Sequence, residues 1–121
     1  MNAITRIMLT LAMALVLASC VARPDVTRTE ALASDGRDIA EAQCAGCHAV
    51  GVYGESPNPV APQFRTLLSR YHADVLQEEL IAGIKIAHPM PEFQFNPQGA
   101  EALIIYLQAI QQDPPPGPDS N

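Results

Sequence analysis

The sequence predicts an all-α domain of three to five short helices. Apolar residues recur at helical spacing near the end of the chain, and shorter stripes with the same spacing precede them. The 121 residues suffice for one domain and not for two, and Ala, Leu, Glu and Gln, which favour helices, are abundant. The hydrophobic content of 48% is inflated by the N-terminus, and there is no Trp, so the remaining core is thin. The fold therefore needs additional apolar mass.

The middle of the chain carries the motif Cys44-Ala45-Gly46-Cys47-His48. Two thiols three positions apart, followed directly by a histidine, form the attachment pattern of c-type haem. Cys44 and Cys47 are predicted to form thioethers with the haem vinyl groups, and His48 to bind the iron through one ring nitrogen as the proximal ligand. One covalent haem c per chain would supply the apolar mass that the core lacks.

Two other interpretations of the motif fit less well. Half of a zinc site would need a second pair of ligands, and the other histidines, His72 and His88, do not form one. A thioredoxin-like dithiol would need a strand before the motif in a βαβ unit, and the sequence shows neither.

Residues 1–19 are predicted to be an export signal. Arg6 supplies the positive charge, and residues 7–18 form an apolar stretch too short to span a bilayer. The stretch ends in Leu17-Ala18-Ser19-Cys20, which resembles the lipoprotein box of bacteria, so Cys20 is predicted to be lipidated. This also explains a third cysteine that would otherwise be unpaired in an oxidising compartment. The alternative is ordinary secretory cleavage after Ala22, giving a soluble periplasmic protein.

Residues 20–33 follow as the predicted lipidated N-terminus and tether, because they show no sustained periodicity. The domain is then expected on the periplasmic side, bound to a membrane by its lipid. An aspartate after the lipidated cysteine tends to retain such proteins in the inner membrane. Val21 occupies that position here and therefore favours the outer membrane.

The first helix is expected to run from a cap at Ser34 or Asp35 to about Ala45. Gly36 lies in its first turn, where a glycine costs helix stability unless another group approaches closely. The sequence therefore predicts that a second helix crosses at Gly36.

Gly36, Ile39 and Ala40, followed by the haem motif, resemble the N-terminal helix of the class I cytochromes c. The resemblance extends over the whole predicted domain, residues 34–112, and implies a haem protein of that fold. It also implies that the C-terminal helix crosses at Gly36 through Leu103 and Tyr106.

Glycines and prolines predict a loop over residues 51–62. Its end, Ala61-Pro62-Gln63-Phe64, resembles the stretch after the haem motif in this family. The resemblance implies that the Pro62 carbonyl accepts a hydrogen bond from the other ring nitrogen of His48 and orients the ring. The alternative is that Pro62 only starts the next helix.

Two apolar stripes follow the loop. Phe64, Leu67 and Leu68 predict a short helix, and the stripe from Leu76 to Ile84 predicts a longer one. Glu78 and Glu79 lie off this second stripe and are expected to form a solvated face. The nearest candidates to hold a haem propionate are Arg65, Arg70 and Tyr71, although each charge could equally serve solubility.

Met90 is the only methionine that remains after the signal is removed. Pro89 and Pro91 hold the backbone extended around it, which suits the presentation of a thioether from a loop. Its place, 42 residues after His48, resembles the distal ligand loop of the family and implies that Met90 is the sixth iron ligand. His88 is the rival for this position, and bis-histidine ligation would lower the reduction potential.

The last helix is predicted to be capped by Asn96 and opened by Pro97. Its apolar positions recur over three turns and predict one fully buried face; they are Ala100, Leu103, Ile104, Leu107 and Ile110. The tail, residues 113–121, is rich in proline and is expected to be extended and disordered.

The expected function is one-electron transfer. With protein ligands on both axial positions no substrate reaches the iron, so the chain is not expected to be an enzyme. Without residues 1–19 it carries six basic and thirteen acidic side chains, a net charge of −7, which disfavours nucleic acid. Its partners are redox proteins, expected to be basic or to dock through the apolar haem edge. The chain is expected to act as a monomer or as a complex subunit.

Two alternatives to a free carrier stay open. An open sixth position would make a haem-based sensor or a peroxidase-like enzyme. A haem subunit of a membrane oxidoreductase complex would relay electrons only within that complex.

Overall fold

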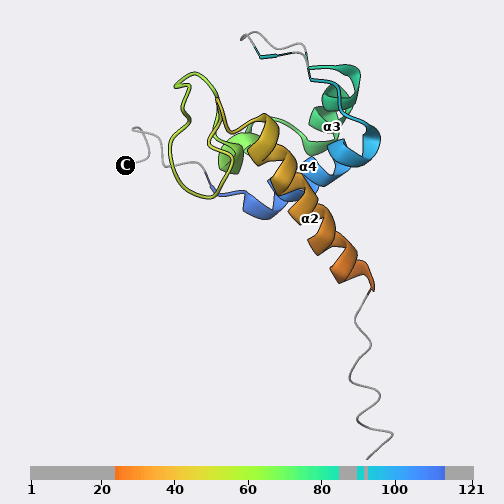
Figure 1. Ribbon diagram of the computed structural model, residues 1–121. Coiled ribbons are helices and arrows are strands. Elements are labelled where there is room, and N and C mark those ends of the chain that lie inside the picture. The colour runs from red at the N-terminus through yellow and green to blue at the C-terminus, as the bar shows by residue number, and fades with distance from the viewer. Residues whose placement is uncertain (1–23, 85–89, 92, 114–121) are drawn as a thin grey trace, which may run out of the picture.

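The computed structural model describes residues 24–84, 90–91 and 93–113. In this part of the chain the elements are α2 (Pro24–Gln43), the 3-10 helix η2 (Phe64–Ser69), α3 (Ala73–Ala82) and α4 (Pro97–Ile110) (Figure 1). No strand occurs among these residues, which confirms the predicted all-α fold. None of the described helices is both long and apolar enough to cross a membrane.

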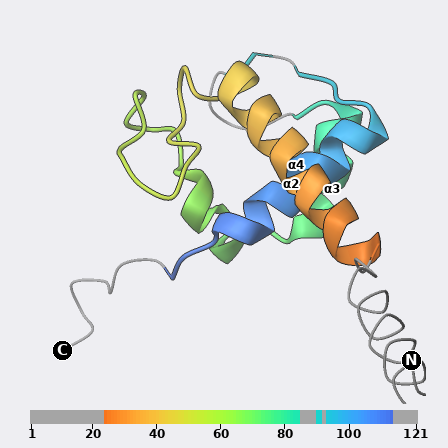
Figure 2. The same cartoon turned by 60° about the horizontal axis from the view of Figure 1, so that its bottom comes forward.

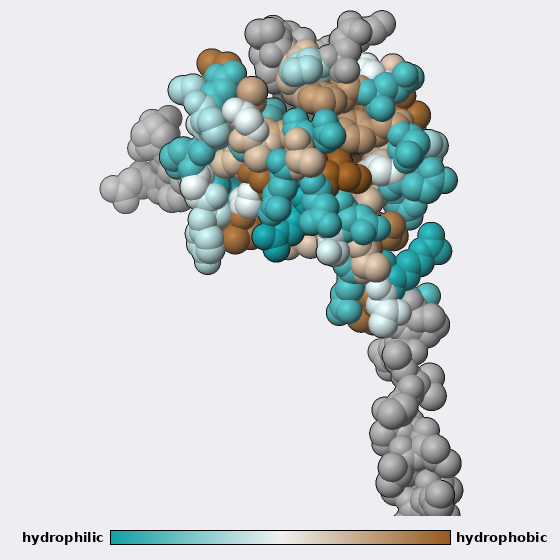
Figure 3. Space-filling model, in the orientation of Figure 1, coloured by the Kyte–Doolittle hydropathy of each residue, from teal (hydrophilic) through white to brown (hydrophobic). Residues whose placement is uncertain are grey.

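Helix α2 begins ten residues before the predicted cap, so the prediction of an N-cap at Ser34 or Asp35 is wrong. Residues 24–33, expected to be an irregular tether, are helical, and the side chains of residues 25–31 are exposed. Periodicity missed this segment because it buries no apolar face. Local preference accounts for it, since Pro24 opens the helix and Asp25 in the first turn favours its dipole. Figure 3 shows that the exposed side of α2 is largely hydrophilic.

Helix α2 lies across α4 in both ribbon views (Figures 1 and 2). The crossing is at Gly36, as predicted. A Cβ atom added there would lie 2.0 Å from the Ala102 carbonyl oxygen and 2.8 Å from the Tyr106 Cβ. Of the two residues predicted to contact Gly36, Tyr106 does so and Leu103 does not. Ala102 is the second contact residue, and Leu103 lines a cavity on the inner side of α4. Only glycine permits the two backbones to approach this closely.

Helix α4 starts as the sequence predicts. The Asn96 side chain accepts a hydrogen bond of 2.7 Å from the Gly99 N–H, and Pro97 occupies the first helical turn. All five predicted core positions are buried, together with Ala102 and Tyr106. The helix therefore forms the centre of the domain.

The C-terminal end of α4 is fastened to η2 by Gln111. Its amide NH₂ donates to the carbonyls of Phe64 (2.8 Å) and Leu107 (2.9 Å), and its oxygen accepts from the Leu68 N–H (3.0 Å). The Leu107 carbonyl is one of the last four of α4, which have no partner within the helix. The bonds to Phe64 and Leu68 fix η2 against the core.

Candidate haem site

The haem motif follows directly from the end of α2. The N–H groups of Cys44 and Ala45 both donate to the Ala40 carbonyl, and those of Cys47 and His48 both donate to the Cys44 carbonyl. The helix thus tightens into a turn after Gln43. This turn places Cys44 and His48 on the wall of one cavity, while Cys47 is exposed and lines a smaller second pocket that Cys44 and His48 also line.

His48 is the one buried polar residue of the described chain, with 7% of its surface exposed. Its Nδ1 lies 2.7 Å from the Pro62 carbonyl oxygen, the hydrogen bond that the sequence implied. Because a carbonyl oxygen only accepts, Nδ1 carries the proton and donates. Pro62 does not begin the next helix, since η2 starts two residues later at Phe64. The Phe64 ring packs beside the imidazole at 5.2 Å between centroids.

The loop after His48 is held by several hydrogen bonds. The Ala49 carbonyl accepts from the Phe64 N–H (3.0 Å), and the Ala49 N–H donates to the Ser56 hydroxyl (3.0 Å). The Tyr106 hydroxyl donates to the Val50 carbonyl at 2.8 Å, and burial raises the pKa of this phenol. These bonds connect the loop to α4 and so support the bond between His48 and Pro62.

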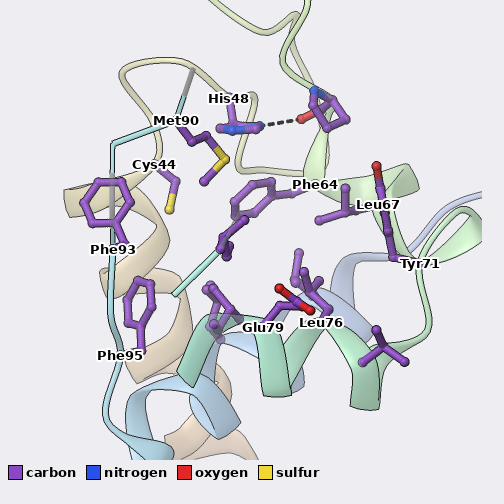
Figure 4. A pocket seen from close by; sticks show the side chains of 16 residues that line it. Cys44, His48, Phe64, Leu67, Tyr71, Leu76, Glu79, Met90, Phe93 and Phe95 are labelled. Carbon is purple, nitrogen blue, oxygen red and sulfur yellow. Dashed lines mark hydrogen bonds between the residues drawn. The ribbon is translucent and has the colours of Figure 1, made fainter. Parts of the chain in front are cut away.

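The cavity has a volume of about 310 Å³ and is enclosed by the end of α2, η2, α3, the segment around Met90 and α4 (Figure 4). This volume is within the range of small-molecule and cofactor sites. Most of the wall is apolar. It consists of Cys44, His48, Pro62, Phe64, Leu67, Tyr71, Val75, Leu76, Glu79, Leu80, Ile84, Met90, Phe93, Phe95, Leu103 and Leu107.

Met90 lines this cavity together with His48, and Figure 4 shows both side chains directed into it. Five residues after Met90 the chain is fastened to α3, because the Phe95 N–H donates to the Leu80 carbonyl at 3.0 Å. The Phe93 and Phe95 rings, 6.2 Å apart between centroids, add apolar wall beside Met90. His88, the rival ligand, lies outside the described residues, as do Cys20 and residues 114–121.

The two thiols of the motif differ in their surroundings. Cys44 is half-buried, and burial raises the pKa of its thiol to about 11, whereas Cys47 is exposed. Neither forms a disulfide. In the part of the chain that the structure describes, no three His, Cys, Asp or Glu side chains gather as a metal site, and His72 lies exposed at the start of α3. The zinc interpretation therefore finds no support there.

Tyr71, one of the three propionate candidates, lines the cavity, whereas sequence reasoning missed Val75 and Glu79 there. All three are partly exposed, so they form the solvent edge of the cavity. Glu79 was expected only on a solvated face; the structure places it on the cavity wall as well. The spacing of four residues between Val75 and Glu79 was the available signal, because such residues share one face of a helix.

The other two propionate candidates take different places. The Arg65 guanidinium donates to the Gly54 carbonyl at 2.8 Å and so holds the loop, while Arg70 is exposed after η2. Tyr71 is the one of the three that lines the cavity.

A family model described as cytochrome c matches residues 33–111. The chain belongs to the cytochrome c family. No curated protein and no solved structure gives a significant match. This cytochrome therefore takes covalently bound haem c as its cofactor and serves haem-based electron transfer. Its residues fit the group, because Cys44 and His48 line an apolar cavity and belong, with Cys47, to a motif with the spacing that haem attachment requires.

Proposed function

We propose that this cytochrome transfers single electrons through a haem c whose iron is bound by His48 and Met90. The observation that carries the proposal is that both side chains line one apolar cavity next to Cys44. Cys44 and Cys47 would hold the haem by thioethers. When bound, the haem supplies the one-electron chemistry of its iron, and the protein sets its potential and access.

The residues of this chain have separable tasks. Pro62 fixes the His48 ring and keeps the proton on Nδ1, so Nε2 is the nitrogen assigned to the iron. Phe64, Leu67 and Leu103 keep water from the cavity. Helix α3 holds the backbone at Phe95, five residues after Met90.

We further propose that the protein works in the bacterial cell envelope, anchored by a lipid at Cys20, and exchanges electrons with redox proteins. The lipoprotein box and the apolar stretch before it support this location. Helix α3, which forms one wall of the cavity, carries Asp74, Glu78 and Glu79 and no lysine or arginine. A partner with a basic surface would complement that charge.

Covalent attachment is tested by extraction with acidified organic solvent. This treatment strips haem that is bound only by its iron, and we expect the haem to stay on the polypeptide. Haem that moves entirely into the solvent would exclude the thioethers.

Ligation by Met90 is tested by absorption spectroscopy of the oxidised and reduced protein. The oxidised protein should show the weak far-red band of sulfur bound to iron, and the reduced protein should bind carbon monoxide poorly. Met90→Ala should abolish the band, admit carbon monoxide and lower the reduction potential, because thioether ligation favours reduced iron. His88→Ala should leave the spectrum almost unchanged. Rapid binding of carbon monoxide by the wild-type protein, or peroxide turnover at enzymatic rates, would instead support a sensor or an enzyme.

A further inference from the structure

Among the described residues, Glu79 is the only carboxylate on the wall of the haem cavity. It lies in the middle of α3, and Figure 4 shows its carboxylate directed toward the cavity from the same helix as Leu76. The other ionisable residues of the wall are Cys44, His48 and Tyr71. Cys44 and His48 bind haem in the proposed function, so Tyr71 is the remaining ionisable residue beside Glu79 on the described part of the wall.

No hydrogen bond or ion pair involves Glu79 among the described residues, in which the one salt bridge joins Arg37 and Glu41 on α2. Between Ser69 and Ala82 the basic side chains are Arg70 and His72, and both are exposed. The negative charge of Glu79 is therefore not neutralised by a contact in this part of the chain. The carboxylate charge of Glu79 therefore interacts electrostatically with a group bound in the cavity, and this interaction is stronger than it would be in bulk water.

Oxidised haem iron carries one more positive charge than reduced iron, so a nearby carboxylate stabilises the oxidised state. We propose that Glu79 lowers the reduction potential of this cytochrome by its charge. The inference rests on the proposed function, because it needs haem in the cavity. In this inference Glu79 changes the reduction potential without binding the iron, whereas the axial ligands His48 and Met90 change it by binding the iron.

Glu78 provides a matched comparison within the same helix. It has the same side chain one position earlier, is exposed, and does not line the cavity. Successive residues of a helix point in directions about 100° apart, so the carboxylate of Glu78 is turned away from the haem. Removal of either charge changes the net charge of the protein equally, and only position distinguishes the two.

The test is spectroelectrochemical titration of the haem-loaded protein at neutral pH and low salt, with Glu79→Gln, Glu78→Gln and Glu79→Asp. Glu79→Gln should favour the reduced state by about threefold, an upward shift of ~28 mV at 59 mV per tenfold for a one-electron couple. Glu78→Gln should shift the potential by less than half as much. Glu79→Asp keeps the charge and should stay close to the wild type.

Salt gives a second readout, because Glu79 is exposed. The difference between wild type and Glu79→Gln should shrink as the Debye length falls from about 30 Å at 0.01 M to about 10 Å at 0.1 M. The far-red band should be the same in all variants, which shows that the ligands are intact.

Equal shifts for the two glutamine variants, or no upward shift for Glu79→Gln, would overturn the role of Glu79. In that outcome the wild-type protein still gives a reversible one-electron couple. A wild-type protein without such a couple would overturn the proposed function and, with it, this inference.

Discussion

Substitution of Gly36 by alanine tests the helix crossing that shapes the domain. The new Cβ would lie 2.0 Å from the Ala102 carbonyl oxygen and 2.5 Å from its carbonyl carbon. Ordinary contacts of this kind begin near 3.4 Å, so α2 and α4 would have to separate by roughly 1.4 Å. Both obstructing atoms belong to the backbone, so no change of rotamer relieves the overlap.

Two opposing terms set the size of the effect. Overpacking in a close contact costs about 3 kcal/mol or somewhat more when the backbone has to move. Alanine gains about 1 kcal/mol over glycine inside a helix. The free energy of unfolding should therefore fall by about 2 kcal/mol, and the melting temperature by roughly 8–16 °C for a domain of this size.

The assay is thermal and guanidinium unfolding of the oxidised holoprotein, followed by circular dichroism and by the haem absorption. Gly51→Ala is the control, because nothing lies within 4 Å of the added Cβ, and its stability should stay within about 0.5 kcal/mol of the wild type. If Gly36→Ala is as stable as the wild type, the close approach of the two helices is not the reason for this glycine.

Three further predictions concern other parts of the chain. Gln111→Ala should cost about 2–3 kcal/mol in unfolding experiments, because two hydrogen bonds to η2 and one to the Leu107 carbonyl of α4 are lost, whereas the exposed Gln108→Ala on α4 should be near neutral. In the haem-free protein at pH 8, iodoacetamide should modify Cys47 before Cys44, whose raised pKa of about 11 keeps its thiol protonated; equal rates by mass spectrometry would contradict this. Cys20→Ala should move the domain from the membrane fraction to the soluble periplasmic fraction with its haem spectrum intact, and a mature wild-type N-terminus formed by cleavage after residue 22 would exclude the lipid anchor.

The sequence by itself determined the features that depend on neighbouring residues. The thiols and the histidine of the haem motif are fixed by their spacing, since attachment to one macrocycle requires it. The start of α4 follows from Asn96 and Pro97, whose effects act within one turn. Gly36 predicted a crossing helix, because glycine costs helix stability at this position unless another backbone approaches closely.

At the start of α2, the helix preferences of individual residues are a better guide than apolar periodicity. Residues 24–33 form a helix without burying an apolar face, so a search for amphipathic spacing finds nothing there. Their helix formers and the proline at the first position were the signal, and summed propensity would have recovered the segment.

The tertiary structure decided which groups meet across long stretches of chain. Pro62 reaches His48 over 14 residues, and Gln111 reaches Phe64 over 47, because the loop folds back and α4 ends beside η2. Glu79 lines the cavity because α3 is rotated so that its edge, and not only its apolar stripe, faces the haem site. Such contacts depend on the path of the whole backbone and on the packing of several helices at once, and no pattern of neighbouring residues specifies that path.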